Sequence, residues 1–459
     1  MALAIYNGQI TMTIMYNIKI YAAFAAFMAS ASPLMAQQPW TADDCMSYAV
    51  HHNHDVRQAE ITADNYRASR AAAIGSFLPT VYVAANAQLN SGRTIDNETN
   101  TYGDYSQFYN GYSLQADLPL FDGCATINRL RAANSNRRMG ESAIARTQDK
   151  AAIDVLQAYA DAVYYEGLAQ VSRQKLAASD STHLQTVRYV ELGLKSDADA
   201  AQTAQQVAAD AYDLSHNEGL AQMSLLKLRQ LMNLPDSVEL TLALPAAADA
   251  ESVTPDAAQV FDAARGSNPS VAEARHAQEA ANFSRKAAIG DAMPSLSIQA
   301  GIGTYYYKYL NSDASATAVF HDQMKGNRSQ YIQAKLVIPI FNGLQSSTSI
   351  RKARNEMRSA QEDYLQSLDN LRNEALTATT DCRQALADLS QSDAKVIADS
   401  IAYHVARRQY EEGLTDPLEL KTAANSLALS RAQNLQCRLT LFLKQRYLNY
   451  LMGNPMINE

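Results

Sequence analysis

The sequence lacks the excess of positive charge that nucleic-acid-binding proteins carry. Its formal net charge is −8, and charged residues make up 19% of the chain, below the roughly 25% of typical soluble domains. Recognisable catalytic motifs are also missing: the chain has no P-loop, no HExxH, no GxSxG and no Rossmann glycine pattern. We therefore expect no enzyme activity, no cofactor, no bound metal and no nucleic-acid partner.

Long apolar runs are absent beyond the N-terminus, so no transmembrane helix is expected. The N-terminus itself has the pattern of an export signal. Lys19 precedes an uncharged run that ends in small residues, which predicts a signal peptide over 1–36 with cleavage after Ala36. Because the first fourteen residues carry no charge, translation is expected to begin at Met12 or Met15. The mature protein is therefore expected to be periplasmic, secreted or inserted in the outer membrane as a β-barrel.

Cysteine and histidine are sparse and do not form a ligand pattern. The four cysteines, Cys45, Cys124, Cys382 and Cys437, include no CxxC, and three disulfide pairings remain open. We expect all four to be small buried residues in helices. His51, His52 and His54 cluster, but the stretch matches Asn268-Pro269 in the second half of the chain, which predicts a helix break rather than a metal site.

What the chain does contain is an internal repeat. PLFDG at 119–123 recurs as PIFNG at 339–343, an offset of 220, and Pro79 recurs as Pro294, an offset of 215. The single change of offset falls inside one expected loop, which is typical of duplicated structure. The repeat predicts a first unit over 37–234, a linker over 235–255 that crosses the outside, and a second unit over 256–459.

Each repeat switches from an alternating pattern to a helical one. Apolar and polar residues alternate over about 80–90, 109–121, 295–309 and 329–341, which predicts four strands in two hairpins. Long stretches rich in alanine and poor in glycine predict six helices. We place them at about 41–77, 123–190, 196–233, 256–292, 343–411 and 416–452.

The alternating strands fit either a half-buried sheet in a soluble protein or a membrane barrel. Aromatic residues favour the barrel, because they gather at the loop ends, where a barrel has its aromatic girdle. They are Tyr102, Tyr105, Phe108, Tyr109, Tyr112, Tyr305, Tyr306, Tyr307 and Tyr309. Four strands cannot close a barrel, and open sheet edges are not tolerated in lipid. The chain must therefore oligomerise, with eight strands from two copies or twelve from three.

The repeated pentapeptide marks the joint between strand and long helix. Pro119 and Pro339 are expected to end the strand ladder, since proline lacks the N–H group. Asp122 and Asn342 are expected to cap the following helix. Gly123 and Gly343 complete the two joints.

A glycine also marks each turn at the far end of the long helices. Gly193 and Gly413 are expected in the left-handed conformation that ends a helix. Ser196 and Asp416 follow in matching positions as N-caps, and Asp199 and Glu419, three residues on, are expected to complete a capping box in each half. Pro417 occupies the first helical position, where proline is favoured.

These features together resemble the TolC-type outer-membrane efflux channels over essentially the whole mature chain. The most specific motifs are IGSFLP and IGDAMP, PLFDG and PIFNG, and the tips RYVELGLKS (188–196) and RQYEEGLTDP (408–417). The resemblance implies an α+β membrane protein that forms a homotrimer. Its twelve-stranded β-barrel, four strands per chain, would stand in outer-membrane lipid. A twelve-helix α-barrel of long antiparallel coiled-coil helices would continue it through the periplasm.

The resemblance also implies roles for the tips. They would form a closed iris that docks onto a periplasmic adaptor protein of an inner-membrane pump of the RND or ABC type. Glu419 matches the family's acidic constriction, with Asp416 and Asp199 as further candidates, whereas the family's second acidic position is Thr422 here. Candidates for the docking tips are Gly193, Leu194, Ser196, Gly413, Leu414 and Thr415. The latch cannot be carried over directly, and Lys195, Arg408 and Tyr410 are its candidates.

The sequence therefore predicts an outer-membrane exit channel of a tripartite efflux system. One alternative keeps the architecture but exports polypeptides in type I secretion. The other is a soluble periplasmic coiled-coil scaffold with a small sheet.

Overall fold

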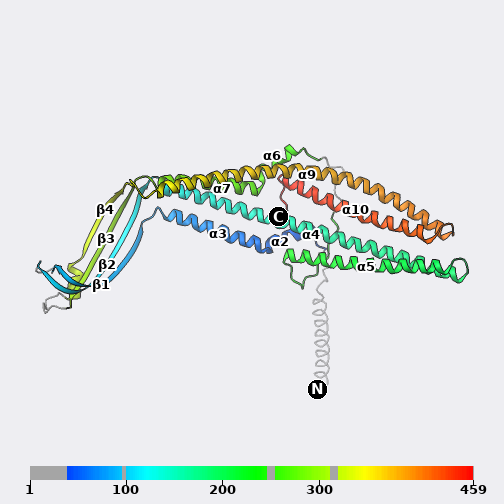
Figure 1. Ribbon diagram of the computed structural model, residues 1–459, viewed down its shortest axis with the longest axis horizontal. Helices are drawn as coiled ribbons and strands as arrows, with labels where there is room; N and C mark the ends of the chain where they lie inside the picture. Colours follow the sequence, from blue (N-terminus) through cyan, green and yellow to red (C-terminus); the bar gives the residue numbers. More distant parts are fainter. Residues whose placement is uncertain (1–38, 96–99, 246–253, 311–318, 458–459) are drawn as a thin grey trace, which may run out of the picture.

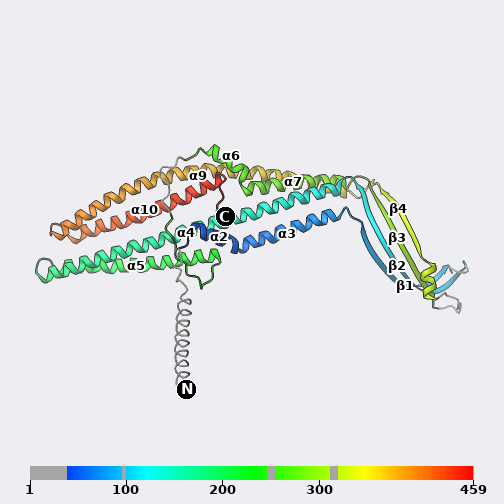
Figure 2. The same ribbon diagram turned by 180° about the vertical axis from the view of Figure 1, so that it is seen from behind.

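The chain forms a long, narrow molecule with a sheet at one end and helical tips at the other (Figure 1). The computed structural model describes residues 39–95, 100–245, 254–310 and 319–457. The expected signal peptide at 1–36 lies outside these residues. The view from behind shows two pairs of long helices that lie side by side (Figure 2).

Two helices of equal length run along most of the long molecule. α4 (Ala125–Glu191) and α9 (Gln345–Glu411) each have 67 residues and run from the sheet to the tips. They are followed by the returning helices α5 (Asp197–Met232) and α10 (Pro417–Leu451). At 1.5 Å per residue, each long helix spans about 100 Å. Half of the buried residues of α4 are alanines, which allow neighbouring helices to approach closely.

The helices that lead into the sheet are broken at asparagine. The structure has α2 (Ala42–His52) and α3 (His54–Gly75) within the helical range 41–77 that was expected to break at the histidine cluster. It has α6 (Ala257–Ser267) and α7 (Pro269–Gly290) in place of one helix over 256–292. The break predicted at the histidine cluster is confirmed. It lies at Asn53, whose side chain accepts hydrogen bonds from the first N–H groups of α3.

The histidines beside this break contact backbone carbonyl groups of their own helix. His51 Nδ1 lies 2.7 Å from the carbonyl oxygen of Ser47, and His52 Nδ1 lies 2.8 Å from that of Tyr48. Within the described ranges, no three His, Cys, Asp or Glu side chains gather as a metal site requires.

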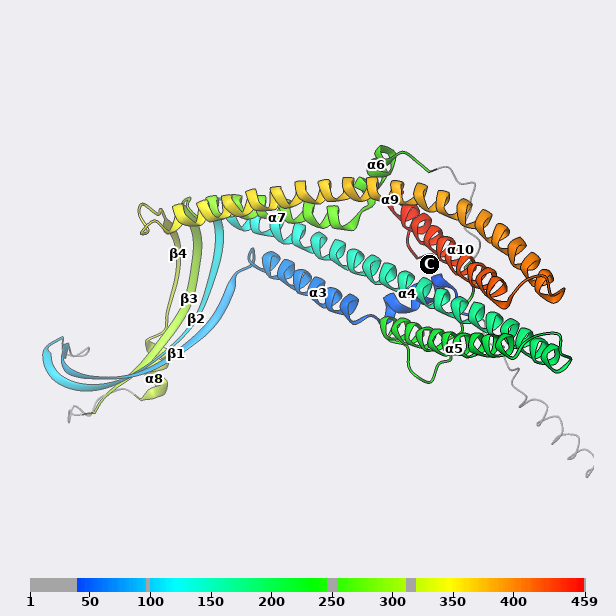
Figure 3. The same ribbon diagram turned by 45° about the vertical axis from the view of Figure 1, so that its right-hand side comes forward.

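Four antiparallel strands form one curved sheet in the order β1-β2-β3-β4 (Figure 3). They are β1 (Thr80–Ile95), β2 (Tyr102–Asp122), β3 (Ser295–Tyr309) and β4 (Ser329–Val337). β1 and β2 are longer than expected because their ladder continues to Ile95 and Tyr102. β4 ends four residues before the expected 341. A short helix that the sequence did not predict, α8 (Phe320–Gly326), precedes β4.

The register of the sheet places rows of apolar residues from all four strands on one face. Val81 lies opposite Ala116, which pairs with Ala300, and Ala300 pairs with Ile332. The next row is polar, and its members hydrogen-bond across the strands. Gln299 donates to Asp117 at 2.7 Å, and Gln333 donates to Gln299 at 2.7 Å. In these two rows each face is therefore of one kind across the width of the sheet, whereas Gln330 lies on the apolar face opposite Ile302 and Val337 on the polar face opposite Ser295.

The expected role of the joint prolines is corrected by the structure. Pro119 does not end its strand, because β2 continues to Asp122 through pairing with β3, with an irregularity between Pro119 and Phe121. Pro339 does lie beyond the end of β4. The prediction failed at Pro119 because β2 has a neighbouring strand on each side. Its pairing with β1 ends at Asp117, before the proline, but its pairing with β3 continues.

The linker between the repeats is partly buried, which also differs from expectation. Val238, Leu240 and Leu242 pack against a buried core at mid-length, and Leu242 forms a parallel bridge with Trp40. Tyr159 in α4 donates hydrogen bonds to the carbonyl groups of Trp40 and Ala243. The stretch 246–253 lies outside the described residues.

The cysteines fit their prediction in part. Cys45 and Cys382 are buried in helices, and Cys437 is half-buried. Burial raises the pKa of the Cys45 thiol to about 12. For Cys124 the prediction is wrong in both respects: the residue is exposed, and it lies just before α4 with a φ of 65°.

Among the described residues, no helix is both long enough and apolar enough to cross a bilayer.

Candidate functional site: the helical tips and their seam

The two tips have the same backbone geometry. Gly193 and Gly413 adopt φ angles of 71° and 74°, in the left-handed region, as predicted. At the first tip the N–H of Gly193 bonds to the carbonyl of Val190, and the N–H of Leu194 bonds to that of Tyr189. This is a Schellman motif, which satisfies the last carbonyl groups of α4. Gly413 and Leu414 repeat it at the end of α9.

The returning helices begin with the predicted caps, but their boxes differ. Ser196 and Asp199 form a reciprocal capping box at the start of α5. Hydrogen bonds from the backbone N–H and the hydroxyl of Ser196 lower the pKa of the Asp199 carboxyl group. Asp416 caps α10 by accepting from the N–H of Glu419.

The capping box predicted at Glu419 is wrong. Its carboxylate accepts a hydrogen bond from the Thr415 hydroxyl rather than from the backbone of Asp416. A threonine two residues before Pro417 supplies a competing donor, whereas Lys195 holds that place in the first tip. Glu419 and Asp416 are both exposed.

Two of the three latch candidates meet in space. The Tyr410 side chain is 1% exposed, and the Lys195 ammonium group lies 3.2 Å from its ring centroid. The Tyr410 hydroxyl is 2.6 Å from the Thr186 hydroxyl, in a buried bond that joins α9 to α4. The third candidate, Arg408, is exposed on α9, and forms no ion pair within the part of the chain that the structure describes.

Thr186 was missed by sequence reasoning. It is fully buried, seven residues before Gly193, but nothing in its neighbourhood distinguishes it from the other threonines of α4. Its partner is 224 residues away in the sequence. Only the packing of the two helical hairpins, α4–α5 and α9–α10, therefore identifies it.

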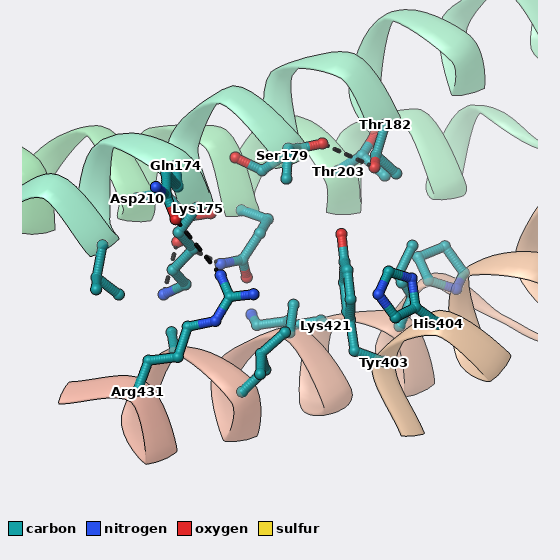
Figure 4. Close-up of a pocket in the computed structure, with 18 of the residues that line it drawn as sticks. Gln174, Lys175, Ser179, Thr182, Thr203, Asp210, Tyr403, His404, Lys421 and Arg431 are labelled. Atoms are coloured by element: carbon teal, nitrogen blue, oxygen red, sulfur yellow. Dashed lines mark hydrogen bonds and ion pairs between the residues drawn. The ribbon is translucent and has the colours of Figure 1, made fainter. Parts of the chain in front are cut away.

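A cavity of about 140 Å³ separates the two hairpins between the mid-length core and the tips (Figure 4). On its α4–α5 wall, Lys175 Nζ lies 2.8 Å from the carboxylate of Asp210, which is 1% exposed. Removing Lys175 would leave the buried carboxylate of Asp210 without its counterion, whereas Lys175 also lies 3.4 Å from the carboxylate of Asp213. The sequence did not predict this pair, because its members lie on different helices of a hairpin whose register was unknown.

The contact between the two helical hairpins, called the seam below, is bridged by amide side chains. Lys421 in α10 donates to Gln205 in α5 at 3.1 Å, and Arg431 in α10 reaches Gln174 in α4 at 3.4 Å. Closer to mid-length the helices touch, since a methyl group at Gly167 would clash with Leu435. The seam is therefore tightly packed at mid-length and held by a few polar links nearer the tips.

At the other end of α4 and α9, the pentapeptide joints act as side-chain caps. Asp122 accepts from the N–H of Thr126 at 2.8 Å, and Asn342 accepts from the N–H of Ser346 at 3.3 Å. The capping prediction is confirmed, although the residue at the N-cap position is two places further on in each case. The joint turns use positive φ at Gly123 and Gly343.

Comparison with known proteins agrees with this geometry. The family model described as outer membrane efflux protein matches residues 46–234 and 260–454. The probable efflux pump outer membrane protein TtgC of Pseudomonas putida is 23% identical over 436 residues, 92% of this chain and 86% of that protein. The cation efflux system protein CusC of Escherichia coli O157:H7 is 24% identical over 405 residues, covering 84% of this chain and 80% of that one.

The fold is shared with solved outer-membrane proteins. The crystal structure of VceC from Vibrio cholerae superposes with a TM-score of 0.76 at 17% identity, covering 90% of this chain and 96% of that one. At that identity the likeness establishes the fold and not the cargo.

Proposed function

Because the chain belongs to the outer membrane efflux protein family, we propose that it is the outer-membrane exit channel of a tripartite efflux system. Substrates would be delivered by an inner-membrane pump, of the RND or ABC type, through a periplasmic adaptor. The family consists of transport proteins, so the channel itself would perform no chemistry. The observation that carries the proposal is the two-part family match, which covers both helical hairpins and all four strands of the sheet.

The assembly proposed is a homotrimer built from two structural repeats per chain. Equal helix lengths in the two halves support the repeats: 11 residues in α2 and α6, 22 in α3 and α7, and 67 in α4 and α9. β1 and β4 are edge strands, and a sheet edge is not tolerated in lipid. Three copies would give a twelve-stranded barrel with an open interior, continued by twelve helices in the periplasm.

The trimer is directly testable. We expect the protein extracted in mild detergent to have the mass of three mature chains, because one chain has two open sheet edges. Multi-angle light scattering or native mass spectrometry measures this. Extraction by carbonate without detergent would instead favour the soluble scaffold, and a stable monomer in detergent would contradict the channel architecture.

The tips are proposed as the adaptor-docking surface. Leu194 and Leu414 are 70% and 73% exposed at the ends of the two turns. Both turns lie at the same end of the molecule (Figure 1), and exposed apolar side chains that gather on one surface are typical of contact with a partner protein. Export of small molecules is preferred over polypeptide secretion because the family model and the relatives reported above carry the word efflux.

Glu419 is proposed as the acidic constriction. In a trimer it would occur three times around one axis and attract cations. We expect Glu419→Ala to lower cation selectivity in single-channel recordings by about twofold or more, while the closed state survives. The matched control is Glu191→Ala, an exposed acid at the other tip. Unchanged selectivity would leave Glu419 as only the acceptor of the Thr415 hydroxyl.

A further inference from the structure

We propose that β4 of one copy pairs with β1 of the next in a single register, with Ile338 opposite Val83. In the same contact, Gly343 of the first copy packs against Gly75 of the second. The inference rests on the proposed ring of identical chains, and it specifies which residues complete that ring. It follows from the pairing inside one chain, shifted by the two repeat offsets.

The offsets reproduce a pairing that the structure contains. In the first hairpin, Thr80 in β1 lies opposite Asp117 in β2. Adding 215 to the first number and 220 to the second gives Ser295 opposite Val337. That is the observed first pair of the second hairpin, with no slip in register. The two hairpins are therefore built alike, residue for residue.

The same shift turns the β2–β3 pairing into a contact between copies. β2 ends the first repeat's hairpin and pairs with β3, which begins the second. In the next step around a ring, β4 takes the place of β2, and β1 of the following copy takes the place of β3. Leu118 opposite Ile298 then becomes Ile338 opposite Val83 of the second copy. Further pairs obtained in this way are Ile332 with Leu89, Ala334 with Ala87 and Gln333 with Gln88.

The side chains on the two edges support this register. Val83 and Leu89 on β1 are 75% and 64% exposed, and Ile332 and Ile338 near β4 are 77% and 60% exposed. The proposed register sets these four apolar residues opposite one another on the apolar face. A slip of one residue would instead oppose apolar and polar side chains throughout, because neighbouring residues in a strand point to opposite faces.

The early end of β4 has the same explanation. The pairing between β1 and β2 ends at Asp117 of β2, yet β2 continues to Asp122 because β3 supplies further partners. β4 ends at Val337, the residue equivalent to Asp117, where its only neighbour stops. A second copy at the free edge would supply the missing partners and extend β4 toward the 341 expected from the sequence.

Glycines at the strand–helix joints give an independent observation. A Cβ atom on Gly123 would lie 2.5 Å from the carbonyl oxygen of Gly290 and 2.6 Å from the Cβ atom of Met293, so the two glycines let their backbones approach closely there. The repeat equivalents of these residues are Gly343 and Gly75. Both face open space in the single chain. Pairing of β4 with β1 of the next copy brings these two glycines into the same contact.

Disulfide trapping tests the register. In a chain whose four native cysteines are replaced by alanine or serine, Gln88→Cys with Gln333→Cys should cross-link neighbouring chains under mild oxidation, and so should Ala87→Cys with Ala334→Cys. Paired strand residues lie about 4.5–5.5 Å apart between Cα atoms, within disulfide range. Matched controls shift the register by two: Gln88→Cys with Tyr331→Cys, or with Lys335→Cys, at about 7–8 Å.

The outcomes separate the register from the trimer. Cross-linked chains in the two predicted pairs, with little in the shifted pairs, support the inference. Efficient cross-linking in a shifted pair, while the detergent mass remains that of three chains, overturns the register and leaves the proposed function standing. A monomeric mass overturns both.

Gly75→Ala tests the glycine contact through the sign of its effect. Gly75 ends α3 with an ordinary helical φ, so without a neighbour alanine would stabilise the helix. Against Gly343 of the next copy it should instead clash, and lower the temperature of trimer dissociation by about 5 °C or more. Gly266→Ala, at an open helical glycine away from the sheet, is the control. An unchanged or raised dissociation temperature for Gly75→Ala would overturn the contact.

Discussion

Gly413→Val is expected to reduce export at least about tenfold while trimer mass and membrane insertion remain unchanged. Gly413 has a φ of 74° and no neighbouring atom that a Cβ would meet. The cost is therefore one of backbone conformation, about 1–2 kcal/mol for a side chain in the left-handed region. That amount cannot unfold a barrel, but the turn can relieve it only by changing shape. The adaptor-docking surface would then be altered in all three copies.

Two matched variants separate backbone conformation from side-chain bulk. Gly219→Val introduces the same side chain at an exposed glycine inside α5, where the space is also open and φ is helical. It should leave export unchanged. Gly413→Asn should retain much of the activity, because asparagine tolerates the left-handed region. Antibiotic or dye efflux in cells that lack their own exit channel is the measurement. Normal export by Gly413→Val at wild-type abundance would contradict the proposed role of the tips.

Tyr410→Ala is expected to leave the channel leaky, with a several-fold rise in the conductance of the resting state. Tyr410 joins the two hairpins through its bond to Thr186 and its contact with Lys195. Replacing a buried aromatic side chain with alanine costs about 3–5 kcal/mol. Because this link joins α9 to α4 and to the turn that follows α4, its loss weakens the seam in each of the three copies.

A graded series identifies which part of the link matters. Tyr410→Phe keeps the ring beneath Lys195 and removes only the hydroxyl, at a cost of about 1 kcal/mol, or roughly fivefold in the closed-to-open equilibrium of one copy. Tyr212→Ala, an exposed tyrosine of α5, is the control. Planar-bilayer recordings should rank the variants with alanine most open and phenylalanine intermediate. A resting conductance for Tyr410→Ala equal to that of the unmodified channel would exclude the residue from the latch.

Local features of the fold could be predicted because neighbouring residues encode them. The alternation in β1, the alanine-rich length of α4 and the capping serine at 196 all act within a few positions of the chain. The errors arose where a second neighbour intervened. Pro119 could not end its strand because β3 supplies another ladder, and Glu419 found a donor in Thr415.

The sequence by itself determined the four strands, the long helices, the two glycine turns and the repeat offsets, because periodicity, capping and left-handed turns are short-range properties. Tertiary structure alone decided which helix faces meet. The Thr186–Tyr410 bond, the Lys175–Asp210 pair and the packing of the linker around Leu242 depend on helices far apart in the sequence. Helices rich in alanine have no strong apolar stripe that would identify their contact face in the sequence. Their contacting residues can therefore be identified only from the packing of the helical hairpins.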